Sequence, residues 1–235
     1  MKDVVARLRA AGSVFAEDEA RLLDGDEELI ARRIAGERLE HVLGWVEFAG
    51  LRIEVDPGVF IPRPQTEALA EHAAALRPVV AVDLFAGSGA IACVVKARNL
   101  DARVVAGELD PVALACLRRN GARYGVEVVG SDIDAGLPGE LEGRVDVLTA
   151  NVPYVPTSEL PFVPHEGEPA ATLDGGADGF ELLRRVAAAA PRWLRPDGVL
   201  LAELPEGTGA VELPGFATTS PVERVLSARQ AVPAR

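Results

Sequence analysis

"VVAVDLFAGSGAIACVVKARNL", residues 79–100, joins three patterns in one short stretch. It begins with an apolar run, turns through the glycine-containing segment AGSG, and ends in a run with helical character. A buried strand, a tight glycine turn and a helix form the unit from which parallel α/β sheets are built. We therefore expect residues 79–100 to open such a sheet.

The same alternation continues toward the C-terminus. Strand-like runs at 102–109, 126–132, 145–150 and 199–204 are separated by two helical runs, "PVALACLRRNGARYG" and "GFELLRRVAAAAPRWL", the second stopped by "RPDG". Strands that alternate with helices predict right-handed βαβ units and a doubly wound, mostly parallel sheet covered on both faces. The last residues supply one or two further edge strands in this prediction.

Three parts are predicted along the chain. Residues 1–44 form a short helical region, whose third helical run covers 27–44 and ends at Gly44. Residues 45–64 form a β-hairpin around Gly50 and a proline-rich linker, because apolar and polar residues alternate there. Residues 65–235 form the α/β domain.

The composition excludes several classes of protein. Hydrophobic residues make up 49% of the 235 residues, enough for a substantial core, and the formal net charge is −12. Such an acidic surface repels phosphate backbones, which disfavours nucleic acid as a partner. The N-terminus has no apolar signal core and no window suggests a membrane span, so we expect a cytoplasmic protein. The two cysteines are expected to be buried, and the three histidines show no metal-ligand spacing, so no metal is predicted.

Polar residues follow several of the predicted strands. In doubly wound sheets, ligands bind beyond the carboxyl ends of the strands, so these residues share one edge. Gly87 and Gly89 let the backbone turn tightly and approach a ligand. Glu108, at the end of the next strand, can accept hydrogen bonds from ribose hydroxyls, and Asp132 can accept from an adenine amino group. This pattern indicates an adenosine-containing ligand.

The tetrapeptide "NVPY", residues 151–154, follows the strand at 145–150. The Asn151 side-chain oxygen and the Val152 carbonyl can accept hydrogen bonds from an N–H group. Pro153 restricts the backbone that aims these acceptors, and Tyr154 offers a flat face for a planar group. The tetrapeptide is therefore the candidate catalytic site for chemistry on a planar nitrogen, with positioning as the main contribution of the protein.

These segments resemble a known family. "DLFAGSGAIA", "GELDPVALACLRRN" and "NVPY" are similar to motifs of S-adenosylmethionine-dependent amino methyltransferases, which have the class I, Rossmann-like fold. "LGWVEFAGLRIEVDPGVFIPRPQTEAL" and "EPAATLDGGADGFELLRRV" resemble a narrower group, the protein-(glutamine-N5) methyltransferases that modify peptide release factors. The resemblance runs from about Glu37 to the C-terminus. It implies S-adenosylmethionine as cofactor and a protein substrate, with a peptide chain release factor as the candidate. We also expect a monomer.

The resemblance also implies roles for individual residues. For the cofactor, it implies a methionine cradle of Phe85, Ala86, Gly87, Ser88 and Gly89, a ribose ligand in Glu108, and adenine neighbours in Asp132 and Ile133. It implies as further residues of the cofactor pocket Asn151, Ile61, Pro62 and Arg63. For the substrate, it implies that Asn151 and the Val152 carbonyl hold the glutamine amide nitrogen, with Pro153 behind them and Tyr154 against the amide plane. The sulfonium methyl group supplies the driving force for transfer.

The sequence departs from the family pattern at several positions. Val152 replaces the first proline of the tetrapeptide, Gln65 replaces a glutamate, and Phe85 and Ala86 replace a glycine and a threonine. The N-terminal helical region, which the family uses to engage the release factor, is short. His165 and Glu166 lie on the long connection after the tetrapeptide, which is a candidate cover for the substrate side.

Other functions remain open at this stage. They are methylation of an adenine amine in nucleic acid, methylation of a small-molecule amide or amine, nicotinamide-dependent oxidoreduction, and cofactor binding without turnover. The acidic charge and the "DPGVFIPRPQTE" segment weigh against nucleic acid. The oxidoreductase alternative leaves the tetrapeptide unexplained.

Overall fold

A computed structural model describes residues 1–160 and 168–231 of the chain. Its centre is a sheet of the strands β3 (Val80–Leu84), β4 (Arg103–Glu108), β5 (Glu127–Gly130), β6 (Val145–Ala150), β7 (Leu194–Glu203), β8 (Phe216–Val222) and β9 (Val225–Gln230). The spatial order is β5-β4-β3-β6-β7-β9-β8. Strands β3 to β7 pair in parallel, whereas β9 runs antiparallel to both β7 and β8.

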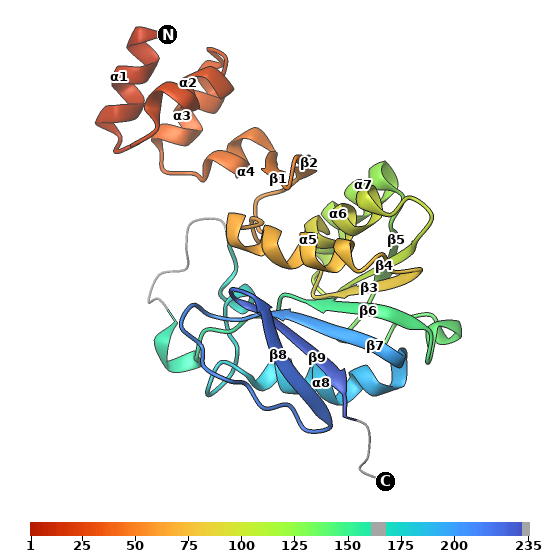
Figure 1. Ribbon diagram of the computed structural model, residues 1–235. Coiled ribbons are helices and arrows are strands. Elements are labelled where there is room, and N and C mark those ends of the chain that lie inside the picture. Colours follow the sequence, from red (N-terminus) through yellow and green to blue (C-terminus); the bar gives the residue numbers. More distant parts are fainter. Residues whose placement is uncertain (161–167, 232–235) are drawn as a thin grey trace.

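Helices cover both faces of this sheet (Figure 1). The helices α5 (Glu67–Ala75), α6 (Ala90–Arg98) and α7 (Pro111–Tyr124) lie on one side, and α8 (Glu181–Trp193) lies on the other. Short 3-10 turns occur at Pro64–Thr66, Gly139–Leu141, Thr157–Glu159 and Ala170–Thr172. The predicted doubly wound α/β fold is thus confirmed.

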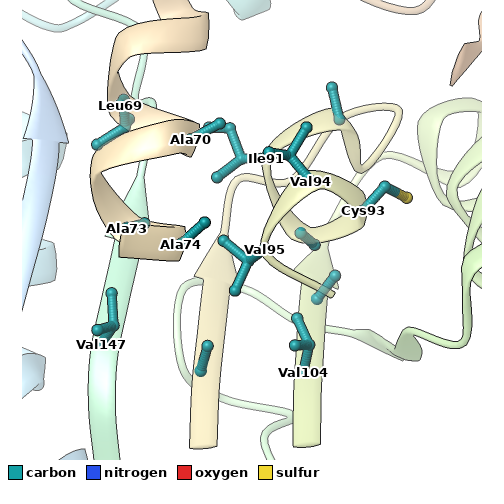
Figure 2. Packing of buried hydrophobic residues seen from close by; sticks show 14 of the residues in the cluster. Leu69, Ala70, Ala73, Ala74, Ile91, Cys93, Val94, Val95, Val104 and Val147 are labelled. Carbon is teal, nitrogen blue, oxygen red and sulfur yellow. The ribbon is translucent and has the colours of Figure 1, made fainter. Parts of the chain in front are cut away.

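Each face has its own hydrophobic cluster because both faces of a parallel sheet are buried. Figure 2 shows the first cluster, in which Leu69 and Ala73 of α5 and Val95 of α6 approach Val104 of β4 and Val147 of β6. The second cluster packs the fully buried Trp193 and other α8 side chains against the opposite face. The small alanines of α5 and α6 let the two helices lie close together and close to the strands.

The N-terminal helices form a separate small cluster. They are α1 (Lys2–Ala10), α2 (Ala16–Leu22), α3 (Glu27–Ile34) and α4 (Leu39–Leu43). Their apolar residues, including Leu8, Leu23 and Ile30, pack on one another. Figure 1 shows these helices set apart from the sheet and joined to it through the hairpin of β1 (Trp45–Phe48) and β2 (Leu51–Glu54). The pairing of β1 and β2 confirms the predicted hairpin.

Two sequence predictions differ from the structure in detail. The single helical run at 27–44 is interrupted, because Gly36 adopts a φ of +104° between α3 and α4. Strand β7 begins at Leu194 rather than after "RPDG", so it includes Pro196 and Gly198. A register shift between Val145 and Val147 of β6 accommodates this irregular start of β7. Both cysteines are buried and free, as predicted.

Candidate functional site

A cavity of about 450 Å³ lies at the carboxyl ends of β3, β4 and β6. Its walls include residues 85–88 after β3, residues 108–111 after β4, residues 151–153 after β6, and Gly58, Phe60, Pro62 and Thr66 from the segment before α5. Pro169, Ala171 and Thr172 add a further wall from the segment after the tetrapeptide. The volume falls in the range usual for small-molecule and cofactor sites.

The structure brings many of the predicted site residues to this cavity. The lining includes Phe85, Ala86, Gly87, Ser88, Glu108, Asn151, Val152, Pro153 and Pro62. Gly89, Tyr154, Ile61 and Arg63 lie next to lining residues without belonging to the lining set. Sequence reasoning did not single out Leu109, which lines the cavity beside Glu108 and is 66% exposed. The feature of the sequence that could have indicated this position is a leucine directly after Glu108, at the end of the predicted strand.

Backbone geometry explains the glycine loop. Gly87 has a φ of +57° and Gly89 a φ of +84°, values that favour glycine. A Cβ at Gly89 would meet the end of the Leu117 side chain of α7, and that buried leucine would then have to shift. Phe85 has a φ of +55°, an unusual value for a residue with a side chain. Such strain concentrates at ligand sites, and Phe85 lines the cavity.

Glu108 holds this loop against β4. One carboxylate oxygen accepts from the Gly87 N–H at 2.7 Å, and the other accepts from the Leu109 and Asp110 N–H groups at 2.8 Å each. A carboxylate has about four acceptor positions, so the three backbone bonds leave capacity for a ligand hydroxyl. Glu108 therefore fits a ribose at this wall of the cavity.

Asp132 and Ile133 lie on the turn after β5, outside the cavity lining. The Asp132 side chain is 59% exposed and stands 3.8 Å from Arg185. Ile133 has a φ of +54°, and its carbonyl accepts from the Ser131 hydroxyl at 2.7 Å. Their assignment to the adenine stays a prediction.

The tetrapeptide is held from two sides. Asn151 donates from Nδ2 to the Thr66 hydroxyl at 3.5 Å, which connects it to the linker before α5. Val152 is only 2% exposed, so its side chain fills the core while its backbone borders the cavity. After Tyr154, Val155 donates to the Leu173 carbonyl at 2.9 Å and accepts from the Gly175 N–H at 2.8 Å. Burial and the nearby Glu203 raise the pKa of Tyr154.

Glu168 joins the linker to the segment after the tetrapeptide, a role that sequence reasoning missed. Its side chain is fully buried and accepts from the Ile61 N–H at 2.8 Å and from Arg63 at 2.6 Å. The Arg63 guanidinium also lies 4.7 Å from the centre of the Phe60 ring. This ion pair holds together two walls of the cavity.

Two further observations concern only the described residues. Within 1–160 and 168–231, no group of three or more His, Cys, Asp or Glu side chains is placed to hold a metal ion. Over the same ranges, no helix combines the length and apolar character that a membrane span requires. His165 and Glu166 fall outside the described residues.

Comparison with known proteins defines the class first. The fold resembles the solved 16S rRNA N2 G1207 methyltransferase (RsmC) of T. thermophilus in complex with AdoMet and guanosine. The TM-score is 0.54 at 20% identity over 80% of this chain and 50% of that one. The protein has the class I fold of S-adenosylmethionine-dependent methyltransferases. The residues around Glu108 and Gly87 fit that cofactor.

Sequence relatives define the family. The chain is 40% identical over 209 residues to the release factor glutamine methyltransferase of Mycolicibacterium smegmatis, covering 86% of this chain and 74% of that one. The chain belongs to the release factor glutamine methyltransferase family. It is also 35% identical over 186 residues to the 4-amino-L-phenylalanine/4-methylamino-L-phenylalanine methyltransferase of Streptomyces pristinaespiralis, covering 74% and 63% of the two chains. No protein-family model matches the chain.

Proposed function

We propose that this methyltransferase acts on the side-chain amide nitrogen of a glutamine in a peptide chain release factor. The observation that carries the proposal is the position of Asn151 on the same cavity as Gly87 and Glu108. The name of the relative that is 40% identical supports the choice of substrate.

The proposed roles follow the geometry of the cavity. Bound S-adenosylmethionine supplies an electrophilic methyl group on a positively charged sulfur. Glu108 binds the ribose hydroxyls, and the loop of Phe85, Ala86, Gly87, Ser88 and Gly89 cradles the methionine part. Asp132 and Ile133 flank the adenine, and Ile61, Pro62 and Arg63 border the pocket from the linker.

The tetrapeptide orients the substrate nitrogen in this proposal. The two N–H groups of the substrate amide donate hydrogen bonds to the Asn151 side-chain oxygen and to the Val152 carbonyl. Pro153 restricts the backbone, and the Tyr154 ring lies against the amide plane. An amide nitrogen is a weak nucleophile because its lone pair is delocalised. Two hydrogen bonds from the substrate N–H groups orient the nitrogen toward the methyl carbon. Such orientation contributes much of the rate acceleration.

A second candidate substrate is a small aromatic amine. The 4-amino-L-phenylalanine/4-methylamino-L-phenylalanine methyltransferase among the relatives supports this candidate, because its name specifies a free amino acid with an aromatic amine as the substrate. Nucleic acid is disfavoured by the net charge of −12. A cytoplasmic monomer with domain boundaries near residues 44 and 64 remains our prediction for the molecule as a whole.

The test incubates the purified protein with peptide chain release factors and labelled S-adenosylmethionine, followed by peptide mass mapping. We expect one added methyl group on a glutamine. Asn151→Ala should lower the rate by about 100-fold or more, because an oriented hydrogen-bond acceptor is lost. The Kd for S-adenosylmethionine should change much less than the rate, since Glu108 and the glycine loop are unchanged. Labelling of 4-amino-L-phenylalanine in place of any release factor would select the second candidate.

A further inference from the structure

We propose that the 174–179 turn is a positioning element that fixes the backbone of Tyr154 in the candidate catalytic tetrapeptide. This inference rests on the proposed function, because it concerns how the Tyr154 ring comes to lie against the substrate amide. The turn belongs to the segment that also supplies Pro169, Ala171 and Thr172 to the cavity wall. It lies well beyond the tetrapeptide in the sequence, so the contact between them arises from the tertiary structure.

The tetrapeptide restricts its own backbone only in part. The ring of Pro153 fixes the φ of that residue and disfavours helical backbone at Val152. It leaves the backbone of Tyr154 free, and Tyr154 lies after the end of β6, outside the regular strands. The position of Tyr154 therefore depends on contacts from other segments.

Backbone hydrogen bonds join the chain directly after the tetrapeptide to the turn. The Val155 N–H donates to the Leu173 carbonyl at 2.9 Å, and the Val155 carbonyl accepts from the Gly175 N–H at 2.8 Å. The Thr157 N–H donates to the Gly176 carbonyl at 2.9 Å. The two segments thus run side by side, like a short piece of sheet.

Asp174 and helix α8 hold the turn itself. The Asp174 carboxylate accepts from the Thr157 hydroxyl at 2.7 Å and from the Gly176 N–H at 3.0 Å. The Gly175 carbonyl accepts from the N–H of Glu181, the first residue of α8, at 3.1 Å. Since α8 is packed on the sheet through its buried residues, the turn has a fixed support.

Two buried glycines of the turn lie directly against the backbone of Tyr154. A Cβ at Gly175 would stand 2.7 Å from the Tyr154 Cα, and a Cβ at Gly179 would collide with the Tyr154 carbonyl oxygen. Both obstructing atoms belong to the backbone, so they cannot move aside as the end of a flexible side chain can. A side chain at either glycine must therefore displace Tyr154 or the turn.

Gly179→Ala tests this close approach, and Gly215→Ala is its matched control. Gly179 has a φ of +78° and Gly215 a φ of +81°, so alanine carries a similar backbone cost at both positions. A Cβ at Gly215 would meet nothing within 4 Å. Gly215 directly precedes β8, at the sheet edge opposite the cavity, because β7 and β8 both run antiparallel to β9.

A second pair of variants tests the side-chain bonds of the turn. Asp174→Ala removes the oxygen that accepts from Thr157 and Gly176. Asp174→Asn keeps a carbonyl oxygen at the same place, so it is the conservative variant.

The measurements follow Tyr154 and the reaction separately. Tyr124 and Tyr154 are the two tyrosines of the chain, so isotope-labelled tyrosine gives NMR signals from these residues, and Tyr124→Phe assigns them. We also measure kcat and KM with a release factor and the Kd for S-adenosylmethionine by calorimetry. All measurements use the full chain at a temperature at which the variants remain folded.

Gly179→Ala and Asp174→Ala should shift or broaden the Tyr154 signal and leave the Tyr124 signal unchanged. Both should lower kcat by about tenfold or more, because a small misplacement of the substrate is costly. The KM and the Kd should change much less than kcat. Gly215→Ala and Asp174→Asn should resemble wild type. If Gly179→Ala does not fold, Asp174→Ala carries the comparison.

An unchanged Tyr154 signal in Gly179→Ala and Asp174→Ala would overturn the inference, as would a wild-type kcat when the signal does shift. An equal loss of kcat in Gly215→Ala would also overturn it, because the backbone cost of alanine would then explain the effect. If wild type methylates no release factor, the proposed substrate is wrong. The Tyr154 signals still test the turn in that case, so the two failures can be told apart.

Discussion

Asp83, near the end of β3, is a carboxyl group enclosed by the core. Its side chain accepts from the Thr149 hydroxyl at 2.7 Å and from the Ala92 N–H at 3.3 Å. Burial raises the pKa of Asp83 to about 7, and the neighbouring Glu108 adds to this increase. The folded protein therefore holds a proton on Asp83 more tightly than the unfolded chain does.

This pKa predicts a pH dependence of stability. A carboxyl whose pKa is raised by folding stabilises the protein fully below its unfolded pKa, and this contribution is lost as pH rises through about 7. Between about pH 5 and pH 7, wild type should lose up to about 1.4 kcal/mol of unfolding free energy per pH unit relative to Asp83→Asn. Urea denaturation at several pH values measures this difference.

Asp178→Asn is the control for this prediction. Its hydrogen bonds with Arg184 lower the pKa of Asp178 to about 2, so this carboxyl stays ionised across the range tested. The difference between wild type and Asp178→Asn should not change with pH. If the unfolding free energies of Asp83→Asn and Asp178→Asn depended equally on pH, the prediction would be contradicted, because Asp83 would then be ionised in the folded protein.

Among the elements, the contact between the linker and the segment after the tetrapeptide decides the shape of the cavity. Pro62 and Pro169 line the cavity from these two segments, and each neighbours a member of the Arg63–Glu168 pair. Removing one partner of a buried pair leaves an uncompensated charge, which is costly. The pair should therefore stabilise both the fold and the cofactor site.

Glu168→Gln should lower the unfolding free energy by about 1 to 3 kcal/mol and weaken binding of S-adenosylmethionine. A double-mutant cycle with Arg63→Met should give a coupling energy above about 1 kcal/mol. Chemical denaturation and calorimetry measure these quantities. The exposed pair of Arg184 and Asp178 is the matched control and should couple much more weakly, because solvent screens it. Similar coupling in the two pairs would contradict the prediction.

Within the described residues, two hydrophobic clusters lie on the sheet and one lies among the N-terminal helices, while a smaller fourth cluster packs linker residues such as Val59 and Ile61 against α7. A hydrogen bond from His41 Nε2 to the Val59 carbonyl, at 3.0 Å, connects the N-terminal helices to the linker. Since the N-terminal helices pack on one another in a cluster of their own, a change in that cluster should have little effect on the cofactor cavity.

Ile30→Ala tests this independence. Ile30 is fully buried among the N-terminal helices, so the truncation should destabilise them by about 2 to 4 kcal/mol. Hydrogen exchange should show faster opening of α1 to α3, while the Kd for S-adenosylmethionine stays within about twofold. Leu148→Ala, a buried change in β6, should weaken cofactor binding. Comparable losses of affinity in both variants would mean that the two parts unfold together.

Sequence periodicity was sufficient to predict the alternating strands and helices, the hairpin and the glycine loop. These features depend on local patterns: apolar runs, glycines where φ is positive, and prolines that end elements. It was also sufficient to place Glu108 and Asn151 at one edge, because all parallel strands present their carboxyl ends there. The insertion of β9 between β7 and β8 was not predicted, since no local pattern specifies which neighbour a strand pairs with.

Tertiary packing alone brings Thr66 to Asn151, Glu168 to Arg63 and Arg224 to Glu203. Each pair joins segments that are distant in the chain, and neither member carries a local signal of its partner. Amino-acid patterns specify the elements and the order in which they follow one another. The contacts that orient the site depend instead on how buried polar groups find partners once the elements have packed, because an unpaired buried group is costly.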